Sequence, residues 1–232
     1  MRFWSYLLVI AFAQSCSHTA NKAVNFIDKD QVQVDIKAEA DSDSKYYVPK
    51  IKFDTEVNNG SVNETLAIMD QVTKAGAKTI VIEINTPGGD IEAGFRLSKA
   101  IEDSPVPIVC VVDGMSASMG MYILESCQTR VGVSRSTYMI HEAAINVGEF
   151  SGHAVKWQSI ADLLKAMNRG MAEHLAKRMH LTADQILEII RGGGQYWFNS
   201  NEAIKNGSID YVVDSVKEVT DSYRNTLHRP EP

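Results

Sequence analysis

The sequence predicts an α/β protein, because strand-like and helix-like segments alternate along it. Two short runs rich in β-branched residues, 79–84 and 108–112, are typical of buried strands. Ahead of them, apolar residues recur at the spacing of one helix face, at Val62, Leu66, Ile68, Met69 and Val72. The chain has 232 residues, of which 44% are hydrophobic, and this suffices for a sizeable core in one domain.

The first elements lead to a glycine-rich turn. Apolar and polar residues alternate at 48–53 and predict a first strand, which the predicted helix follows. The strand at 79–84 then ends in Asn85-Thr86-Pro87-Gly88-Gly89-Asp90. A proline followed by two glycines favours a turn that other groups can approach closely, since glycine tolerates positive φ and has no side chain. Such a turn can direct backbone N–H donors at a carbonyl group.

The segment 114–120 carries the strongest functional signal. The strand at 108–112 stops at small residues and an apolar run restarts at Met121, a pattern typical of a strand, a tight turn and a helix. A serine at the helix start gains from the unpaired backbone N–H groups there, which also suit an oxyanion. Ser118 is therefore the candidate nucleophile. The alternative is that Ser116 and Ser118 are small residues that allow close helix packing.

His141 is the candidate general base. It follows a strand-like run at 136–140. A lone histidine is more often structural than catalytic, but one that follows a glycine turn and a serine turn fits a serine–histidine arrangement.

Three segments taken together resemble the successive signatures of the ClpP family of serine peptidases. They are Asn85-Thr86-Pro87-Gly88-Gly89, Ala117-Ser118-Met119-Gly120 and Met139-Ile140-His141. The resemblance runs from about residue 48 to 213 and implies the ClpP/crotonase-like fold of stacked ββα units. It also implies a protruding handle helix in the amphipathic stretch that opens at Gly152, and a closing helix, turn and strand at 201–210.

The resemblance implies a serine endopeptidase that hydrolyses peptide bonds in peptide or protein substrates. Ser118 matches the nucleophile, His141 the general base, and the N–H groups of Gly89 and Met119 the oxyanion hole. No metal or other cofactor is needed, and the residues after His141 lack the second histidine of a zinc-protease motif. The family also implies a homo-oligomeric ring. ClpP-type enzymes rely on partner ATPases, and nothing in this chain would itself hydrolyse a nucleotide. An apolar stripe in the handle region suits ring stacking or ordinary core: Ile160, Leu163, Leu164, Met167, Met171 and Leu175.

The third member of the triad departs from the family pattern. Family members carry an aspartate between the handle helix and an aromatic strand, and counting along this chain from either side reaches Ile189 or Arg191 instead. Glu188 is the closest carboxylate and our candidate acid, although it also suits a solvated helix face. Gln195 or a backbone carbonyl could hold His141 without a charge. A missing acid is also what a catalytically inactive scaffold would show.

Two other functions stay open at this point. Membrane-associated Ser-Lys proteases of the signal-peptide peptidase A and NfeD types resemble this chain at 85–89, and Lys156 or Lys165 could then be the base. Crotonase-fold hydratases and isomerases also use paired N–H donors, but the chain has no evident basic patch for coenzyme A.

The N-terminus predicts export. Arg2 precedes an apolar segment at 3–13, which is short for a membrane span and suits a signal-peptide core. Small residues then lead to Cys16, as at a bacterial lipoprotein cleavage site, where this cysteine would become the lipidated first residue. We expect a signal peptide at 1–15, a flexible polar tether at 16–45 and the peptidase domain at 46–232, in a lipid-anchored protein of the bacterial cell envelope. Ordinary secretion, an uncleaved anchor and a cytoplasmic location are the alternatives.

Charge and cysteines give two further expectations. The net charge is −6 and no basic run is interleaved with aromatic residues, so we expect no nucleic-acid partner. Cys110 and Cys127 are expected as buried free thiols, although export would permit a disulfide between them.

Overall fold

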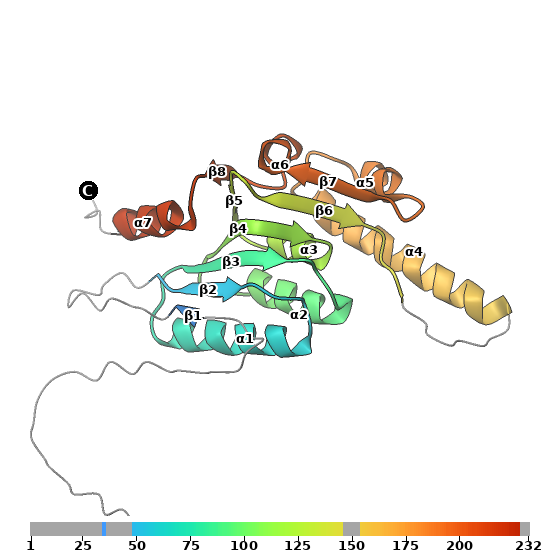
Figure 1. Ribbon diagram of the computed structural model, residues 1–232. Helices are drawn as coiled ribbons and strands as arrows, with labels where there is room; N and C mark the ends of the chain where they lie inside the picture. Colours follow the sequence, from blue (N-terminus) through green and yellow to red (C-terminus); the bar gives the residue numbers. More distant parts are fainter. Residues whose placement is uncertain (1–33, 36–47, 146–153, 228–232) are drawn as a thin grey trace, which may run out of the picture.

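The computed structural model describes residues 34–35, 48–145 and 154–227. Within these residues one eight-stranded sheet runs through the molecule, with helices against it (Figure 1). The predicted α/β class is therefore confirmed. The predicted signal peptide and Cys16 lie outside the described residues, and of the predicted tether only a two-residue strand is described.

The sheet has a mostly parallel main body and a short branch. The main body has the order β1-β2-β3-β4-β5-β8, with β1 antiparallel at one edge and the other strands parallel. Its strands are β1 Val34–Asp35, β2 Lys50–Phe53, β3 Ile80–Thr86, β4 Ile108–Ala117, β5 Thr129–Val133 and β8 Tyr211–Val213. The branch is formed by β6 Thr137–His141, which pairs with β4, and by β7 Gln195–Asn199, which pairs antiparallel with β6.

Apolar residues on both faces of the strands explain the helices on both sides of the sheet. Along β3, Ile80, Ile82 and Ile84 pack into the core beneath α1 Asn59–Lys74 and α2 Ile91–Glu102. The alternate residue Val81 packs on the other face, with Val219 of α7 Val216–Leu227. Side chains alternate between faces along a strand, so a strand covered on both sides reads as one continuous apolar run.

Strand β4 changes partner partway along its length, and this leads the chain to the site. Residues 109–112 pair with β5, whereas 115–117 pair with β6. Gly114 lies between the two parts with φ of 120°, and a Cβ atom there would lie 2.5 Å from Asn85 Oδ1. That same oxygen accepts a hydrogen bond of 3.0 Å from the Met115 N–H group. The Asn85 side chain and the glycine therefore shape the bend together.

The long helix predicted after Gly152 is present as α4 Ala154–Ala176, which projects from the body of the molecule (Figure 1). Its buried residues, Ala172, His174 and Leu175, all lie near its C-terminal end. Leu163, in the predicted apolar stripe, is 51% exposed. The helices α5 Ala183–Ile190 and α6 Ser200–Asn206 complete the fold. None of the helices in the described residues is long and apolar enough for a membrane span.

The expectation of free thiols was wrong. Cys110 of β4 and Cys127, just after α3 Met119–Glu125, form a disulfide with their Cα atoms 5.9 Å apart. Both residues are fully buried. Helix α3 returns the chain alongside β4, and the resulting separation is in the usual range for a disulfide. Spacing along the sequence does not reveal this return.

Candidate active site

Ser118 occupies a strained turn between β4 and α3. Its φ is 55°, and among the described residues it is the one non-glycine residue with positive φ. Such a conformation costs about 1–3 kcal/mol and persists only where the surroundings enforce it. One enforcing contact is the hydrogen bond of 2.8 Å from Ser118 N–H to the Met139 carbonyl in β6. The turn predicted at this serine is therefore confirmed.

The Pro-Gly-Gly turn lies directly against the serine. A Cβ atom at Gly88 would lie 2.7 Å from Ser118 Cβ and 3.0 Å from Met119 N, so no side chain fits between the two turns. At Gly89, where φ is 145°, a Cβ atom would lie 2.2 Å from the Val57 carbonyl oxygen. The predicted close approach at this turn therefore depends on the absence of both side chains.

The two N–H groups expected to form the oxyanion hole belong to these adjoining turns. Met119 is the first residue of α3, so its N–H group has no acceptor within the helix. Hydrogen bonds to Val57 engage the Gly88 carbonyl and the Asp90 N–H group, on either side of Gly89. Among the backbone hydrogen bonds that the described residues form outside helices and strands, neither Gly89 nor Met119 acts as donor. Both groups thus suit an oxyanion, and this role stays a prediction.

His141 contacts the candidate nucleophile. The pairing of Ala117 with Met139 aligns the end of β4 with the end of β6 and so brings the two side chains together. The distance between His141 Nε2 and Ser118 Oγ is 2.7 Å, a short hydrogen bond. Burial lowers the pKa of His141 below its ordinary value of 6.5. The ring is therefore neutral near pH 7 and can accept a proton.

Glu188, our candidate acid, pairs with an arginine and not with His141. Its carboxylate forms an ion pair of 2.6 Å with Arg191, and both side chains are largely exposed. The buried face of α5 is instead formed by Ile186 and Ile190. A helix places residues four apart on one face, so Glu188, midway between them, points to solvent. We therefore withdraw Glu188 as the acid.

Gln195 is the cross-strand neighbour of His141. The two residues pair directly between β6 and β7, so their side chains leave the sheet on the same side. The Gln195 side-chain oxygen accepts a hydrogen bond of 3.2 Å from Trp197 Nε1. The position beside the histidine is thus held by a neutral amide that is engaged with another side chain.

Among the residues that the structure describes, none that lines the pocket around the pair carries a carboxylate. Apart from Ser118 and His141 its lining is mainly apolar and comprises Tyr122, Ile140, Asn168, Met171, Ala172, Leu175, Ile186 and Ile190. Neither Lys156 nor Lys165 belongs to it, and Lys165 pairs with Asp162 on the exposed surface of α4. The pocket therefore gives a lysine-base mechanism no support.

Asn168 of α4 is a site residue that sequence reasoning missed. Its Oδ1 accepts a hydrogen bond of 2.7 Å from the Ala143 N–H group, two residues beyond His141. The contact attaches the end of the histidine-bearing segment to the long helix. One polar residue within an amphipathic helix gives no signal of such a role in the sequence.

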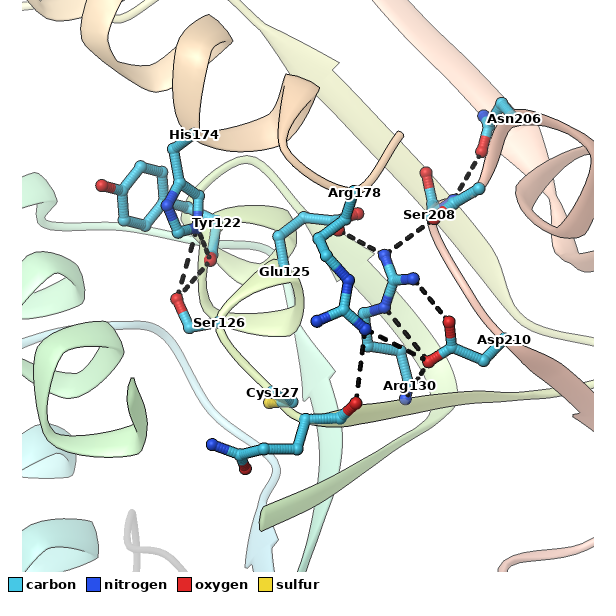
Figure 2. Close-up of polar contacts among 12 residues, drawn as sticks. Tyr122, Glu125, Ser126, Cys127, Arg130, His174, Arg178, Asn206, Ser208 and Asp210 are labelled. Carbon is cyan, nitrogen blue, oxygen red and sulfur yellow. Dashed lines mark hydrogen bonds and ion pairs between the residues drawn. The ribbon is translucent and has the colours of Figure 1, made fainter. Parts of the chain in front are cut away.

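The other end of α3 carries a buried polar network (Figure 2). Arg130 donates to Glu125 at 2.5 Å and to Asp210 at 2.6 Å, and its side chain is almost wholly buried. Arg178 of the segment after α4 lies 3.7 Å from Asp210. Burial raises the pKa of Glu125 to about 8, against the opposing effect of Arg130. The network joins the end of α3 to β5, to the start of β8 and to the end of α4.

A second serine–histidine contact in the same region is not a second nucleophile. His174 Nε2 lies 3.3 Å from Ser126 Oγ and 3.1 Å from the Tyr122 carbonyl oxygen (Figure 2). A carbonyl oxygen only accepts hydrogen bonds, so Nε2 must carry the proton and cannot take one from Ser126. Ser126 Oγ itself donates to the same carbonyl. These contacts therefore hold α4 against α3.

Comparisons with known proteins identify the family of this chain. The Clp protease family profile matches residues 39–216. The ATP-dependent Clp protease proteolytic subunit 3 of Rhodococcus jostii is 33% identical over 144 residues, which are 61% of this chain and 69% of that protein. The proteolytic subunit 1 of Leifsonia xyli is 29% identical over 166 residues, covering 69% of this chain and 81% of the relative.

A solved structure shows the same fold. A point mutant of ClpP1 from Listeria monocytogenes aligns with a TM-score of 0.64 at 20% identity, over 72% of this chain and 92% of that one. The family profile covers most of the sequence, and the two relatives described above are proteolytic subunits. This chain therefore belongs to the Clp protease family and is a serine-type peptidase.

Proposed function

We propose that this chain hydrolyses peptide bonds with a Ser118–His141 dyad that works without a carboxylate partner. The observation that carries the proposal is the 2.7 Å contact between Ser118 Oγ and His141 Nε2 in a pocket whose described lining residues include no acidic side chain. This contact favours an active enzyme over an inactive scaffold, because it joins the histidine to a serine held in a strained turn at a helix start, whereas His174 Nε2 near Ser126 is engaged with a carbonyl oxygen.

The reaction follows from the positions of these groups. Neutral His141 takes the Ser118 proton at Nε2 while Oγ attacks the peptide carbonyl carbon. The N–H groups of Gly89 and Met119 bind the resulting oxyanion. His141 then protonates the leaving amine, and later deprotonates the water that releases the acyl group. The imidazolium formed in between has no carboxylate beside it among the described lining residues, so we expect slower turnover than a full triad would give.

We propose that the protein is exported and anchored through a lipid on Cys16. The signal-like N-terminal segment supports this location, and so does the buried disulfide, because disulfides persist mainly in oxidising compartments. Outside the cytoplasm no ATP would be available to an unfolding partner. The substrates are then peptides or flexible protein segments. Detergent extraction of the native protein, with and without Cys16→Ser, tests the anchor; recovery of both forms in the soluble fraction would contradict it.

We also propose a homo-oligomeric ring, as family membership implies. The N-terminal part of α4 supports contact with other copies, because it exposes the large apolar residues Val155, Trp157 and Leu163. Light scattering on the purified protein measures the assembly, and a strictly monomeric active enzyme would contradict this proposal.

The dyad is tested by labelling the purified protein with a fluorophosphonate serine-hydrolase probe and measuring the intact mass. We expect one adduct on the wild type, none on Ser118→Ala and very slow labelling of His141→Ala. Absence of any adduct on a folded wild-type protein would favour the inactive scaffold. Full labelling of His141→Ala would overturn the assignment of the base.

A further inference from the structure

The disulfide closes a loop around the catalytic serine. Cys110 lies in β4 ahead of Ser118, and Cys127 lies just beyond α3, the helix that begins after Ser118. The bond spans 17 positions of the sequence, with the serine near the middle of the loop. The strand, the strained turn and the helix that form the nucleophile are therefore one covalently closed unit.

We infer that the Cys110–Cys127 disulfide positions Ser118, and that the enzyme reaches full activity only when this bond is formed. The inference rests on the proposed function, because it concerns the reactivity of the same serine. It adds a redox requirement for maturation that the Ser118–His141 geometry alone does not contain.

The first argument is the shortness of α3. The helix has seven residues, and a helix of this length is not stable without attachments to its surroundings. No side-chain hydrogen bond caps its N-terminus at Ser118. Its direction therefore depends on tertiary contacts: the core packing of its buried residues and, at its C-terminal end, Cys127 and the Glu125–Arg130 ion pair (Figure 2).

The second argument is the strain at Ser118. A serine with φ of 55° returns to an ordinary conformation unless both flanking segments are held. The strand side is held by the β-sheet, including the pairing of Ala117 with Met139. The disulfide holds the helix side to that same strand. Freedom at this joint would move Oγ away from His141 and the Met119 N–H group away from Gly89.

The third argument concerns when the bond can form. Both cysteines are fully buried, so the folded protein shields them from reagents. Formation takes place by thiol–disulfide exchange during folding, with a small-molecule or protein disulfide as oxidant. One cysteine thiolate attacks the donor disulfide, and the second then displaces the donor. The chain's two thiols are thereby oxidised to the disulfide, while the donor is reduced to two thiols and receives the two protons.

The test compares oxidised and reduced protein in a Cys16→Ala background, so that every counted thiol belongs to the pair. Alkylation in denaturant with intact mass measures the thiols, and the fluorophosphonate probe at saturating concentration measures the limiting labelling rate of Ser118. Reduced protein is obtained by refolding with dithiothreitol, and the matched control carries Cys110→Ala and Cys127→Ala. All rates are taken well below the melting temperature of every form.

We expect no free thiols in the oxidised protein, and a melting temperature about 10 °C lower without the bond. We expect the limiting rate to fall about 10- to 100-fold on reduction, since small misplacements of reacting groups have effects of this size. Unfolding the reduced protein and refolding it with oxidised glutathione should restore the rate, and the alanine pair should label slowly with or without reductant.

Two results would overturn the inference while leaving the proposed function intact. One is two free thiols in a fully active protein as purified. The other is an equal limiting rate in oxidised and reduced protein, even with a lowered melting temperature, which would make the bond purely stabilising. Absence of labelling in every form would instead overturn the proposed function, and the inference with it.

Discussion

Charged side chains are distributed differently at the two ends of helix α3. At its N-terminal end, Ser118 and His141 meet in a pocket where the lining residues that the structure describes include no carboxylate. At its C-terminal end, Glu125 and Arg130 form a buried ion pair that Asp210 extends. The acidic side chains of this region thus serve to hold the helix, while the reaction relies on a neutral histidine and backbone N–H groups.

The comparison teaches how a strained reactive turn is maintained. The unfavourable conformation at Ser118 persists because surrounding contacts outweigh its cost. The network at the far end of the helix and the disulfide beside it supply such contacts. Reactivity at one end and rigidity at the other are therefore two properties of one short helix, and variants can separate them.

The largest expected effect is at the N-terminal end of α3, where His141 contacts Ser118. His141→Ala should lower the labelling rate of Ser118 about 10²- to 10⁴-fold, because His141 is the one base among the described residues that line the pocket. The melting temperature should change little, since the ring is only partly buried. Stopped labelling time courses measure the rate, and a loss of less than tenfold would show that another base serves Ser118.

The second-largest effect is expected at the C-terminal end of α3, where Arg130 pairs with Glu125. Arg130→Met should reduce the free energy of unfolding by about 3 kcal/mol, because it removes the partner of the buried Glu125 carboxyl group and of Asp210. Burial already places the folded-state pKa of Glu125 near 8, above its ordinary value of 4.5. The folded protein therefore holds this proton more tightly than the unfolded chain does. The carboxyl group favours the folded state fully below about pH 4.5, and this contribution is lost as the pH rises from there towards 8.

Urea denaturation of Arg130→Met at about pH 5 and about pH 8 measures this dependence, and the loss should be larger at the higher pH. The matched control adds Glu125→Gln, which removes the ionisable group and should recover part of the stability at the higher pH. Equal losses at both pH values would show that Glu125 does not carry the effect.

A smaller effect should follow from adding a charge at the reactive end. Gln195→Glu places a carboxylate opposite His141, which should raise the pKa of the histidine and increase the labelling rate several-fold, up to about tenfold. The acid limb of the pH–rate profile should move to higher pH by up to about one unit. Gln195→Ala is the control and should leave the acid limb at its wild-type position. The same pH–rate profile for Gln195→Glu and Gln195→Ala would show that position 195 does not face the imidazole ring of His141.

The smallest effect is expected at Glu188. Its ion pair with Arg191 is exposed, so Glu188→Gln should change the labelling rate less than about twofold and stability by less than about 0.5 kcal/mol. Labelling and thermal unfolding of the variant measure both quantities. A large loss of rate with unchanged stability would restore Glu188 as the acid.

Local patterns were sufficient to predict the strands, the first helix and the serine–histidine pair. Apolar runs define β3 and β4, and the resemblance at Ser118 and His141 identified residues that the sheet register does bring together. These features depend on neighbouring residues or on short motifs, which is why the sequence reveals them.

The acid and the disulfide depended on three-dimensional contacts instead. Glu188 was chosen by counting along the chain, although Ile186 and Ile190, four apart, already indicated that the inward face of that helix is apolar. Cys110 and Cys127 meet because α3 turns back beside β4. Arg130 looks like a surface residue in the sequence, and only the fold shows the two carboxylates that allow its burial.

The central claim, a serine peptidase whose histidine has no carboxylate partner, is tested most directly by the pH dependence of wild-type labelling. Burial lowers the pKa of His141, so the neutral base should persist below its ordinary value of 6.5. We expect the rate to rise with pH and to reach half of its maximum below that value. A midpoint clearly above 6.5 would reveal an anionic partner of His141 and contradict the account.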